Sequence, residues 1–422
     1  MRWHAHGGGR GDPGRPGRWA LMVALLWAMA CPLASAAPSP EPASVTVTLW
    51  VPARGGYLAA WREAARLAAA AHPDVFIAIE PIWADYGARL TLALAEGHAP
   101  ELVALPSALA ARLAARGWLT PVDEMVRRHP PAPAARVPFT WEGRLYALPG
   151  VMDPVVLYAD AGALAEAGVS AEHLSTWDAL LDAARRVRAA GRLPWPTVVN
   201  GWPPLAMFIW QAGGTLLTSA GQPWDSAEAV ATAATFYRRF VAEELSPSAP
   251  WSWAEPADLP FRRGEVALFM GLLSDPLELP DAASPFRPGE PGVVGPAGRR
   301  VRVVPAPAGP AAAATWLSLE GVAIPRTAPP AASQALAHLA EALEAMGWQP
   351  SLERRPEARA VALEALARAR AMPAHPAFLE FDAVWWQDVV VPLVQGNGPL
   401  DVEELLQRAG RRLEQALQAM PR

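Results

Sequence analysis

The stretch VTVTLWVPARGGYLAAWREAARLAAAAHPDVFIAI, residues 45–79, carries the strongest indication of the fold class. It begins with a β-rich segment, residues 45–50, and passes through a Gly-Gly loop into a helical stretch, residues 58–71, whose large apolar residues lie near one face. His72-Pro73 ends this helix, and residues 75–79 predict a second strand. A strand, a helix and a strand in this order are typical of a parallel sheet covered by helices.

The same alternation continues along the chain. Residues 86–95 predict a helix, 102–105 a strand and 108–115 another helix that ends at Gly117. In such sheets, ligands bind at the loops beyond the carboxyl ends of the strands. We therefore expect one rim to be formed by residues 54–57, Asp85-Tyr86 and Pro106-Ser107.

The middle and the end of the chain give weaker patterns. We expect a hairpin at residues 141–146, strands at 155–158 and 317–324, and a turn that leads into a buried strand within 261–270. A capping-box-like start at residues 175–178 predicts a helix that runs toward Ala190 and ends at Gly191, and a further helix is expected at 227–244. Residues 280–313, rich in Pro, Gly and Ala, are expected to be mostly loop, as is the Gly- and Pro-bounded segment that contains Trp202. After residue 324, helices are expected to dominate.

The first 36 residues have the layout of a secretory signal peptide. Four Arg residues precede an apolar run at residues 19–30, and the small residues Ala34-Ser35-Ala36 follow it. About 12 apolar residues make a helix of roughly 18 Å, too short for a hydrocarbon core of about 30 Å. We predict cleavage after Ala36 and a periplasmic or extracellular location, with a retained membrane anchor as the less favoured alternative.

Cys31 leaves a second possibility for processing. It closes the apolar run as in a bacterial lipoprotein, but Ala28 stands three residues before it, where such signals usually have Leu. Cleavage after Ala36 is the preferred interpretation, and lipidation at Cys31 is the alternative. Since this is the only cysteine of the chain, cleavage after Ala36 would leave no disulfide or thiolate chemistry.

Composition excludes several classes of function. The remaining chain of about 385 residues is long enough for two domains. The net charge is −5, all 36 basic residues are Arg, and no basic stripe indicates nucleic-acid binding. The 19 Trp exceed what a core requires, and the surplus offers stacking faces to a ring-shaped ligand such as a sugar.

No sequence motif indicates catalysis, a cofactor or a metal. The match GRGDPG at residues 9–14 to a dinucleotide-binding pattern precedes the apolar run without a strand before it, so it is a false match. Phosphate-loop, HExxH, CxxC and GxSxG patterns are absent. The histidines beyond the signal peptide are scattered along the chain, and we predict no metal site, no cofactor and no enzymatic activity.

Several short motifs, each weak alone, are similar in order and spacing to one family. They are GRLYALP (residues 143–149), VVLY (155–158), AGV (167–169), TWDAL (176–180), the segment 261–270, GVAIP (321–325), MP (372–373) and FDAVW (381–385). The chain resembles the extracellular solute-binding proteins of carbohydrate ABC importers, the group of the maltose-binding and glycerol-3-phosphate-binding proteins. The resemblance covers residues 45 to about 416. Ala159-Asp160 and Thr315-Trp316 depart from the family pattern.

The resemblance implies an α/β fold of two lobes that enclose a ligand. After the signal peptide, 1–36, lobe 1 would comprise residues 37–148 and 316–370, and lobe 2 residues 149–315 and 371–422. Crossings between the lobes are expected near residues 148–153, Thr315 and Met372. The implied function is binding of a small polar solute, a sugar, polyol or glycerol phosphate, and its delivery as a monomer to the transmembrane subunits of an ABC permease.

We predict eight ligand-binding residues. Tyr86, Trp202 and Trp385 offer aromatic faces, the last two at positions where the resemblance implies stacking, and Asp153 offers a carboxylate to a polyol. Arg54 suits a carboxylate or phosphate group. Ser107, Gly271 and Trp316 are weaker candidates. An extracytoplasmic carbohydrate-active enzyme, which needs a pair of carboxylates in its cleft, and a ligand-binding partner of a sensory receptor are the alternatives.

Overall fold

The computed structural model describes residues 45–53, 55–83, 85–199, 202–218, 222–248, 259–274, 300–347, 356–395 and 400–418. The predicted signal peptide, Cys31 and Arg54 lie outside the described residues, and so does the side chain of Trp202.

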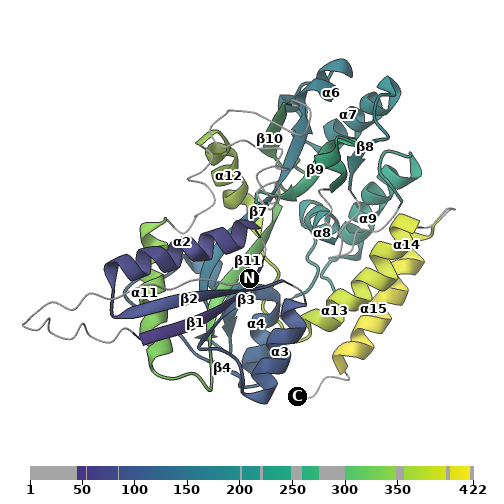
Figure 1. Cartoon of the computed structure of the whole chain (residues 1–422). Helices are drawn as coiled ribbons and strands as arrows, with labels where there is room; N and C mark the ends of the chain where they lie inside the picture. The colour runs from purple at the N-terminus through teal and green to yellow at the C-terminus, as the bar shows by residue number, and fades with distance from the viewer. Residues whose placement is uncertain are drawn as a thin grey trace, which may run out of the picture. The chain divides into compact units, whose positions relative to one another are not determined.

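The first strands confirm the parallel arrangement predicted from residues 45–79. Strand β1 (Val45–Pro52) pairs in parallel with β2 (Val75–Ile82) and with β3 (Leu102–Pro106). Helix α2 (Gly55–Ala71) connects β1 to β2, and α3 (Tyr86–Glu96) connects β2 to β3 (Figure 1). Helix α4 (Ser107–Ala115) follows β3 directly. Each predicted element is present, extended by one to three residues at an end.

Two long strands continue the sheet beyond β3 and make it mixed. Strand β11 (Thr315–Pro325) is antiparallel to β3 and to β7 (Leu148–Asp160), and the strand order is β2-β1-β3-β11-β7-β9-β8. Beyond Asp153, β7 pairs with β9 (Val266–Leu272), which is parallel to β8 (Trp195–Val198). The short strands β4 (Leu119–Thr120) and β12 (Ala369–Arg370) pair with β11, and β5 (Thr140–Trp141) and β6 (Arg144–Leu145) form the predicted hairpin.

The remaining helices lie between the later strands in sequence and at the end of the chain. They are α5 (Pro133–Arg136), α6 (Ala161–Glu166), α7 (Trp177–Ala190), α8 (Trp202–Gln211), α9 (Ala227–Ala242), α10 (Leu259–Arg263), α11 (Ala331–Ala345), α12 (Pro356–Arg368), α13 (Phe378–Trp385), α14 (Val391–Gln395) and α15 (Val402–Gln418). A π-helical turn, Trp386–Val390, joins α13 to α14, and short 3-10 turns lie at Val137–Phe139 and Ala171–His173.

Two segments expected to be loop are regular structure. Trp202 begins α8, because the prolines that follow it stand in the first turn, where a missing N–H costs no helical hydrogen bond. Strand β10 (Val301–Pro305) lies within the segment predicted as loop and pairs antiparallel with β7. Its Val-rich sequence, VRVVP, suits a strand. The Pro and Gly residues elsewhere in the segment 280–313 gave the whole segment the composition of a loop, so this strand was not predicted.

The buried apolar residues form three clusters. The first cluster contains residues of β1, β2 and β3 together with α2, α4 and α11. The second contains residues of α7, α8, α9, α13 and α15. The third, smaller cluster joins Tyr158 of β7 and Phe269 of β9 to Ala362 and Ala365 of α12. Both long strands pass from the first cluster to the second: β7 between Val151 and Val155, and β11 between Leu319 and Trp316.

Candidate functional site

Tyr86 stands at the predicted rim, where the loops after the parallel strands meet. It is the first residue of α3, and its hydroxyl donates to the backbone oxygens of Ala104 in β3 and Trp50 in β1. Burial is the main reason that the pKa of Tyr86 is raised well above its usual value, and the nearby charge of Glu320 raises it further. Its hydroxyl therefore stays protonated and ties the carboxyl-terminal halves of two neighbouring strands together.

Asp153 and Ser318 lie opposite each other on β7 and β11, at the point where both strands pass between the first two apolar clusters. Asp153 is 1% exposed, and its carboxylate accepts hydrogen bonds from the amide and the hydroxyl of Ser274. On the other side, Tyr57 of α2 donates its hydroxyl to the Ser318 hydroxyl over 2.8 Å. We call these four residues, Tyr57, Asp153, Ser274 and Ser318, the crossing network.

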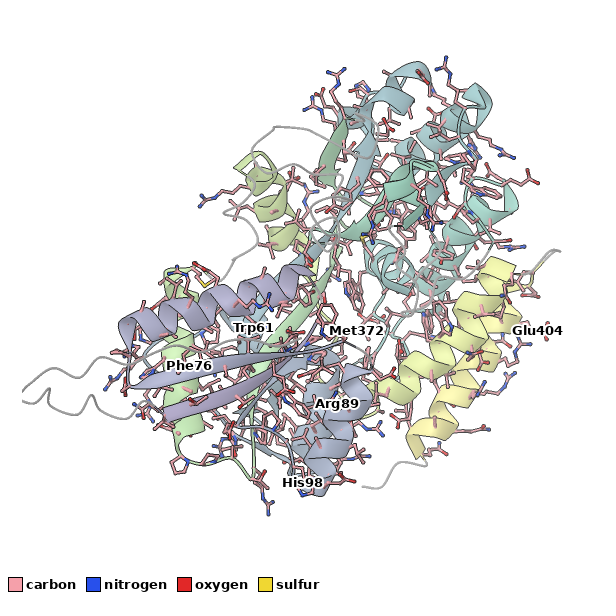
Figure 2. All side chains as sticks on the ribbon, in the orientation of Figure 1. Trp61, Phe76, Arg89, His98, Met372 and Glu404 are labelled. Carbon is pink, nitrogen blue, oxygen red and sulfur yellow. The ribbon has the colours of Figure 1, made fainter. Side chains whose placement is uncertain are left out.

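Glu320 is a second buried carboxylate on the same strand. It pairs in register with Pro106 of β3 and with Val151 of β7, and it accepts a hydrogen bond of 2.5 Å from the indole N–H of Trp61 in α2. Figure 2 labels Trp61 on α2, above the sheet. A buried carboxylate that lost its hydrogen bond would be costly in a low-dielectric interior, so the bond from Trp61 to Glu320 fixes the position of α2 against β11.

Gly150 provides the space that Trp61 occupies. A Cβ on Gly150 would lie 2.0 Å from the Trp61 ring, so any larger residue would displace the indole. The register of β7 against β11 shifts at the same point, where Val151 pairs with Glu320 and Pro149 with Gly321, which leaves Gly150 as a bulge. The bulge and the glycine together allow the Trp61 ring to approach the backbone of β7 closely.

Trp316 and Trp385, two of the predicted tryptophans, lie in packed surroundings. Trp316 is 9% exposed and stacks on Trp210 of α8 with ring centroids 5.4 Å apart. Trp385 is fully buried, stacks on Phe381 and meets Trp224 edge-on. In the described structure Trp385 contributes to the second cluster, and its role toward a ligand stays a prediction. Trp202 stands at the start of α8.

The remaining predicted residues occupy strand and helix ends. Ser107 is the first residue of α4, directly after β3, and Gly271 of β9 pairs with Val156 of β7. Asp160, one of the departures from the family pattern, accepts hydrogen bonds from the amides of Gly162 and Ala163 and so caps α6. This departure has a structural reason at a helix start.

The structure brings together some of the predicted residues and adds others. Tyr86 and Ser107 lie at the ends of neighbouring elements beside Glu320, and Asp153 lies further along the crossing strands. Glu320 and Ser318 were not predicted, and Tyr57 was expected only as part of the rim loop, residues 54–57. Glu320 carried a usable signal, since it is the one charged residue within the apolar segment 316–325. Ser318 carried none, because 261 positions separate it from its partner Tyr57.

Trp83 offers an aromatic face to solvent at the same rim. It directly follows β2 and is 79% exposed, whereas most large apolar residues of this part of the chain are buried. The partly exposed residues of the crossing strands are Met152, Leu317 and Ser318. An exposed indole offers a sugar ring a stacking face, and polar groups elsewhere in a site pair with the sugar hydroxyls.

Within the described residues, no helix is long and apolar enough to cross a membrane. Three potential metal ligands, His72, Asp74 and His338, do lie close together in the described part of the chain, away from the rim.

The chain was compared with known proteins. The profile of the family described as bacterial extracellular solute-binding protein matches residues 55–346. No curated protein sequence matches the chain.

Solved structures of similar fold include an ABC transporter solute-binding protein from Thermotoga lettingae bound with α-D-tagatose, with a TM-score of 0.71 and 22% identity over 89% of this chain and 100% of that one. UgpB from Mycobacterium tuberculosis in complex with glycerophosphocholine has a TM-score of 0.70 and 19% identity, over 89% of this chain and 99% of that one. Maltose-bound MalE3 from T. maritima has a TM-score of 0.69 and 18% identity, over 88% of this chain and 99% of that one. At these identities the likeness establishes the fold, and it confirms the predicted two-lobe α/β architecture.

Proposed function

Because the chain belongs to the bacterial extracellular solute-binding proteins, we propose that it binds a sugar or polyol and delivers it to the transmembrane subunits of an ABC importer. The observation that carries this proposal is the crossing network, which gathers hydroxyl and carboxylate groups where β7 and β11 pass between the two main apolar clusters. The tagatose and maltose named for two structures of the same fold support the choice of solute class.

A neutral solute fits this junction better than a phosphate or carboxylate. Asp153 and Glu320 are both buried on the crossing strands, and an ionised carboxylate only accepts hydrogen bonds. A phosphate or carboxylate anion also only accepts hydrogen bonds, so it has no donor to offer to these groups. Sugar hydroxyls, in contrast, donate to such groups and to the carbonyls and hydroxyls around them.

We propose a division into two lobes that follows the apolar clusters except on the crossing strands β7 and β11, which contribute to both clusters. Residues 37–148 and 316–347 form lobe 1, and residues 149–315 and 371–422 form lobe 2. We assign α12 to lobe 2 because Ala362 and Ala365 pack with residues of β7 and β9. Closure of the lobes around a solute would exclude water, and the solute would bias this hinge equilibrium.

The finer features of this role are also proposals. The chain is exported by the segment 1–36, with lipidation at Cys31 as the alternative to cleavage after Ala36. It acts as a monomer and leaves the solute chemically unchanged. A Kd near 1 μM corresponds to about 8 kcal/mol, which a stacking face and several hydrogen bonds supply after the costs of ordering.

A thermal-shift screen of monosaccharides, maltodextrins, polyols and glycerol phosphates tests the proposal. We expect a sugar or polyol to raise the melting temperature, and calorimetry to confirm one binding site. Recovery of the same solute after incubation would show that no bond was changed. A shift with glycerol phosphates alone would contradict the choice of a neutral solute, and turnover of a glycoside would contradict the binding role.

Trp83→Ala is the variant that locates the site. We expect it to weaken binding of the best solute by about 1 kcal/mol, roughly fivefold, through loss of a stacking face. Phe76→Ala is the matched control, since Phe76 is an exposed aromatic residue near the opposite end of the same strand (Figure 2). Equal affinities of both variants and the parent would place the solute elsewhere.

A further inference from the structure

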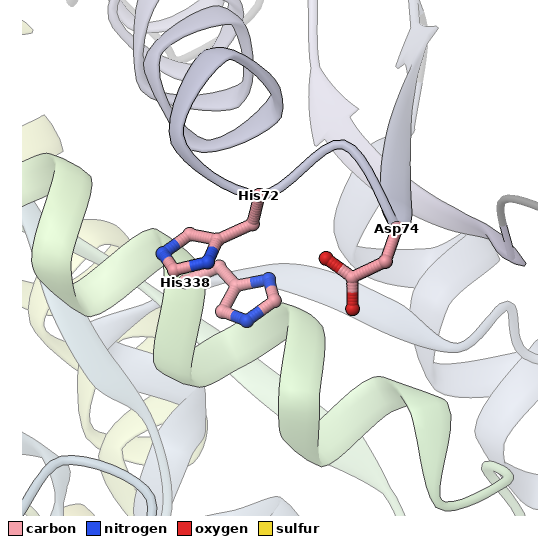
Figure 3. A group of neighbouring side chains, drawn as sticks. All are labelled: His72, Asp74 and His338. Carbon is pink, nitrogen blue, oxygen red and sulfur yellow. The ribbon is translucent and has the colours of Figure 1, made fainter. Parts of the chain in front are cut away.

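His72, Asp74 and His338 come together from distant parts of the chain. His72 directly follows α2, Asp74 immediately precedes β2, and His338 lies within α11. One ligand atom of each lies within 4.8 Å of the others. The imidazole rings are stacked with centroids 3.7 Å apart, and the Asp74 carboxylate points toward them (Figure 3).

Neighbouring side chains hydrogen-bond to two of these groups, and a metal would bind once one imidazole turns out of the stack, because parallel rings direct their lone pairs into separate planes. Glu341 lies one helical turn after His338, and its carboxylate is 2.9 Å from Nε2 of His72. When Nε2 carries the proton and donates to Glu341, the lone pair is on Nδ1. A carboxylate that bonds the second nitrogen of a histidine is the usual outer partner of a metal-bound imidazole. Gln334 donates to Oδ2 of Asp74 over 2.7 Å, which leaves Oδ1 for a metal.

We propose that His72, Asp74 and His338 bind a divalent transition-metal ion, for which Zn²⁺ is the representative. Two imidazole nitrogens and one carboxylate oxygen form a mixed set that suits zinc and its neighbours, whereas Ca²⁺ and Mg²⁺ prefer oxygen ligands alone. Asp74 is exposed and the histidines are partly exposed, so solvent reaches the site and water completes the coordination.

The site is separate from the rim proposed to bind the solute. The backbone oxygen of Asp74 accepts from the amide of Val45, the first residue of β1, and Asp74 precedes the first residue of β2. The cluster therefore stands at the amino ends of β1 and β2. Trp83 and Tyr86, which are proposed to lie at the solute site, follow the carboxyl end of β2. A metal here would join α2, β2 and α11, and it would stabilise the first apolar cluster without contacting the solute.

Zinc titration of the full mature chain, freed of metal with a chelator, tests this proposal. We expect binding of one Zn²⁺ by calorimetry in competition with a chromophoric chelator, and a melting temperature that rises with zinc concentration, because a ligand that binds the folded state stabilises it. His338→Gln and Asp74→Asn should each weaken zinc binding by more than about tenfold, and Glu341→Gln by about tenfold or more through loss of the outer carboxylate.

Two control variants distinguish this site from other histidines. His98→Gln removes an exposed histidine after α3 (Figure 2), and His129→Gln removes the partner of Glu344, next to the cluster. Both should bind zinc as the parent does. The proposal is wrong if the parent shows no zinc-dependent stabilisation, if His338→Gln and Asp74→Asn retain parental affinity, or if only His129→Gln loses it. Circular dichroism without zinc confirms that each variant is folded.

Discussion

At the scale of single residues, Gly150 and Trp61 show how one missing side chain determines local packing. The Trp61 ring lies where a Cβ on Gly150 would stand, and from there its N–H reaches Glu320. The indole thereby fills a bulge and satisfies a buried carboxylate at the same time. This contact was not predictable from sequence, since neither residue lies in a recognisable motif and 259 positions separate Trp61 from Glu320.

We expect Gly150→Ala to lower the free energy of unfolding by about 1–3 kcal/mol, because the added methyl group must displace a packed indole. Urea denaturation measures this change. Gly87→Ala in α3 is the control, because the added Cβ would meet Leu109 of α4 at an ordinary contact distance of 3.8 Å. Since Ala favours a helix over Gly, this substitution should be neutral or stabilising by up to about 1 kcal/mol. Equal stability of the two variants would contradict the packing argument.

Asp382 of α13 gives a pH-dependent prediction. Burial raises the pKa of its carboxyl group from 3.8 to about 6, so the folded state favours the protonated form. The resulting stabilisation is complete below pH 3.8 and is lost as the pH rises through about 6. Asp382→Asn should therefore be more stable than the parent at pH 7.5, by at most about 3 kcal/mol, and nearly equal to it near pH 4. Urea midpoints at both pH values test this, and a difference that does not change with pH would refute it.

At the scale of elements, helices α4 and α13 connect the two main apolar clusters through an ion pair. Arg112 of α4 donates to Oε1 of Glu380 over 2.6 Å, and both side chains are partly buried. Oε2 of Glu380 is buried without a hydrogen-bond partner in the described structure, so the single bond to Arg112 carries most of the compensation for desolvation.

A double-mutant cycle of Arg112→Ala and Glu380→Ala should give a coupling energy of about 0.5–1 kcal/mol in thermal or urea unfolding. The pair Arg66–Glu63 within α2 is the matched comparison, because it is more exposed and its coupling should be closer to zero. Coupling at Arg112–Glu380 no larger than at Arg66–Glu63 would show that the contact between the clusters adds little to stability.

The elements also show which parts of the fold are predictable from sequence. The alternation in residues 45–115 predicted the first three strands, because apolar periodicity is a local property. The expected capping box of α7 began at Ser175, whereas the Thr176 side chain caps the helix by accepting from the amide of Ala179, and Gly191 ends the helix as predicted. Helix α8 and strand β10 were missed because their prolines indicated loops. The crossing network and the His72–His338 contact depend on packing between distant segments, which no local pattern reports.

At the scale of the whole molecule, solute and metal are proposed to bind at opposite ends of the same strands. If both proposals hold, each ligand stabilises the folded chain independently, by about 2.7 kcal/mol at a hundredfold excess over its Kd. The increases in unfolding free energy should then add within about 0.5 kcal/mol. Unfolding measured with neither, either and both ligands tests this, and a solute affinity that changes severalfold with zinc would instead reveal coupling between the sites.

The hydrogen-bonded pairing of β7 and β11 also limits how the two halves can move. The strands are joined from Leu317–Pro154 to Val322–Leu148, with one irregularity beside Glu320 and Gly321. A paired two-stranded ribbon resists stretching and bending within its plane but twists readily, and a bulge locally increases that twist. Displacement of one half against the other should therefore be mainly a rotation about the long axis of this ribbon, where β7 and β11 pass between the two clusters.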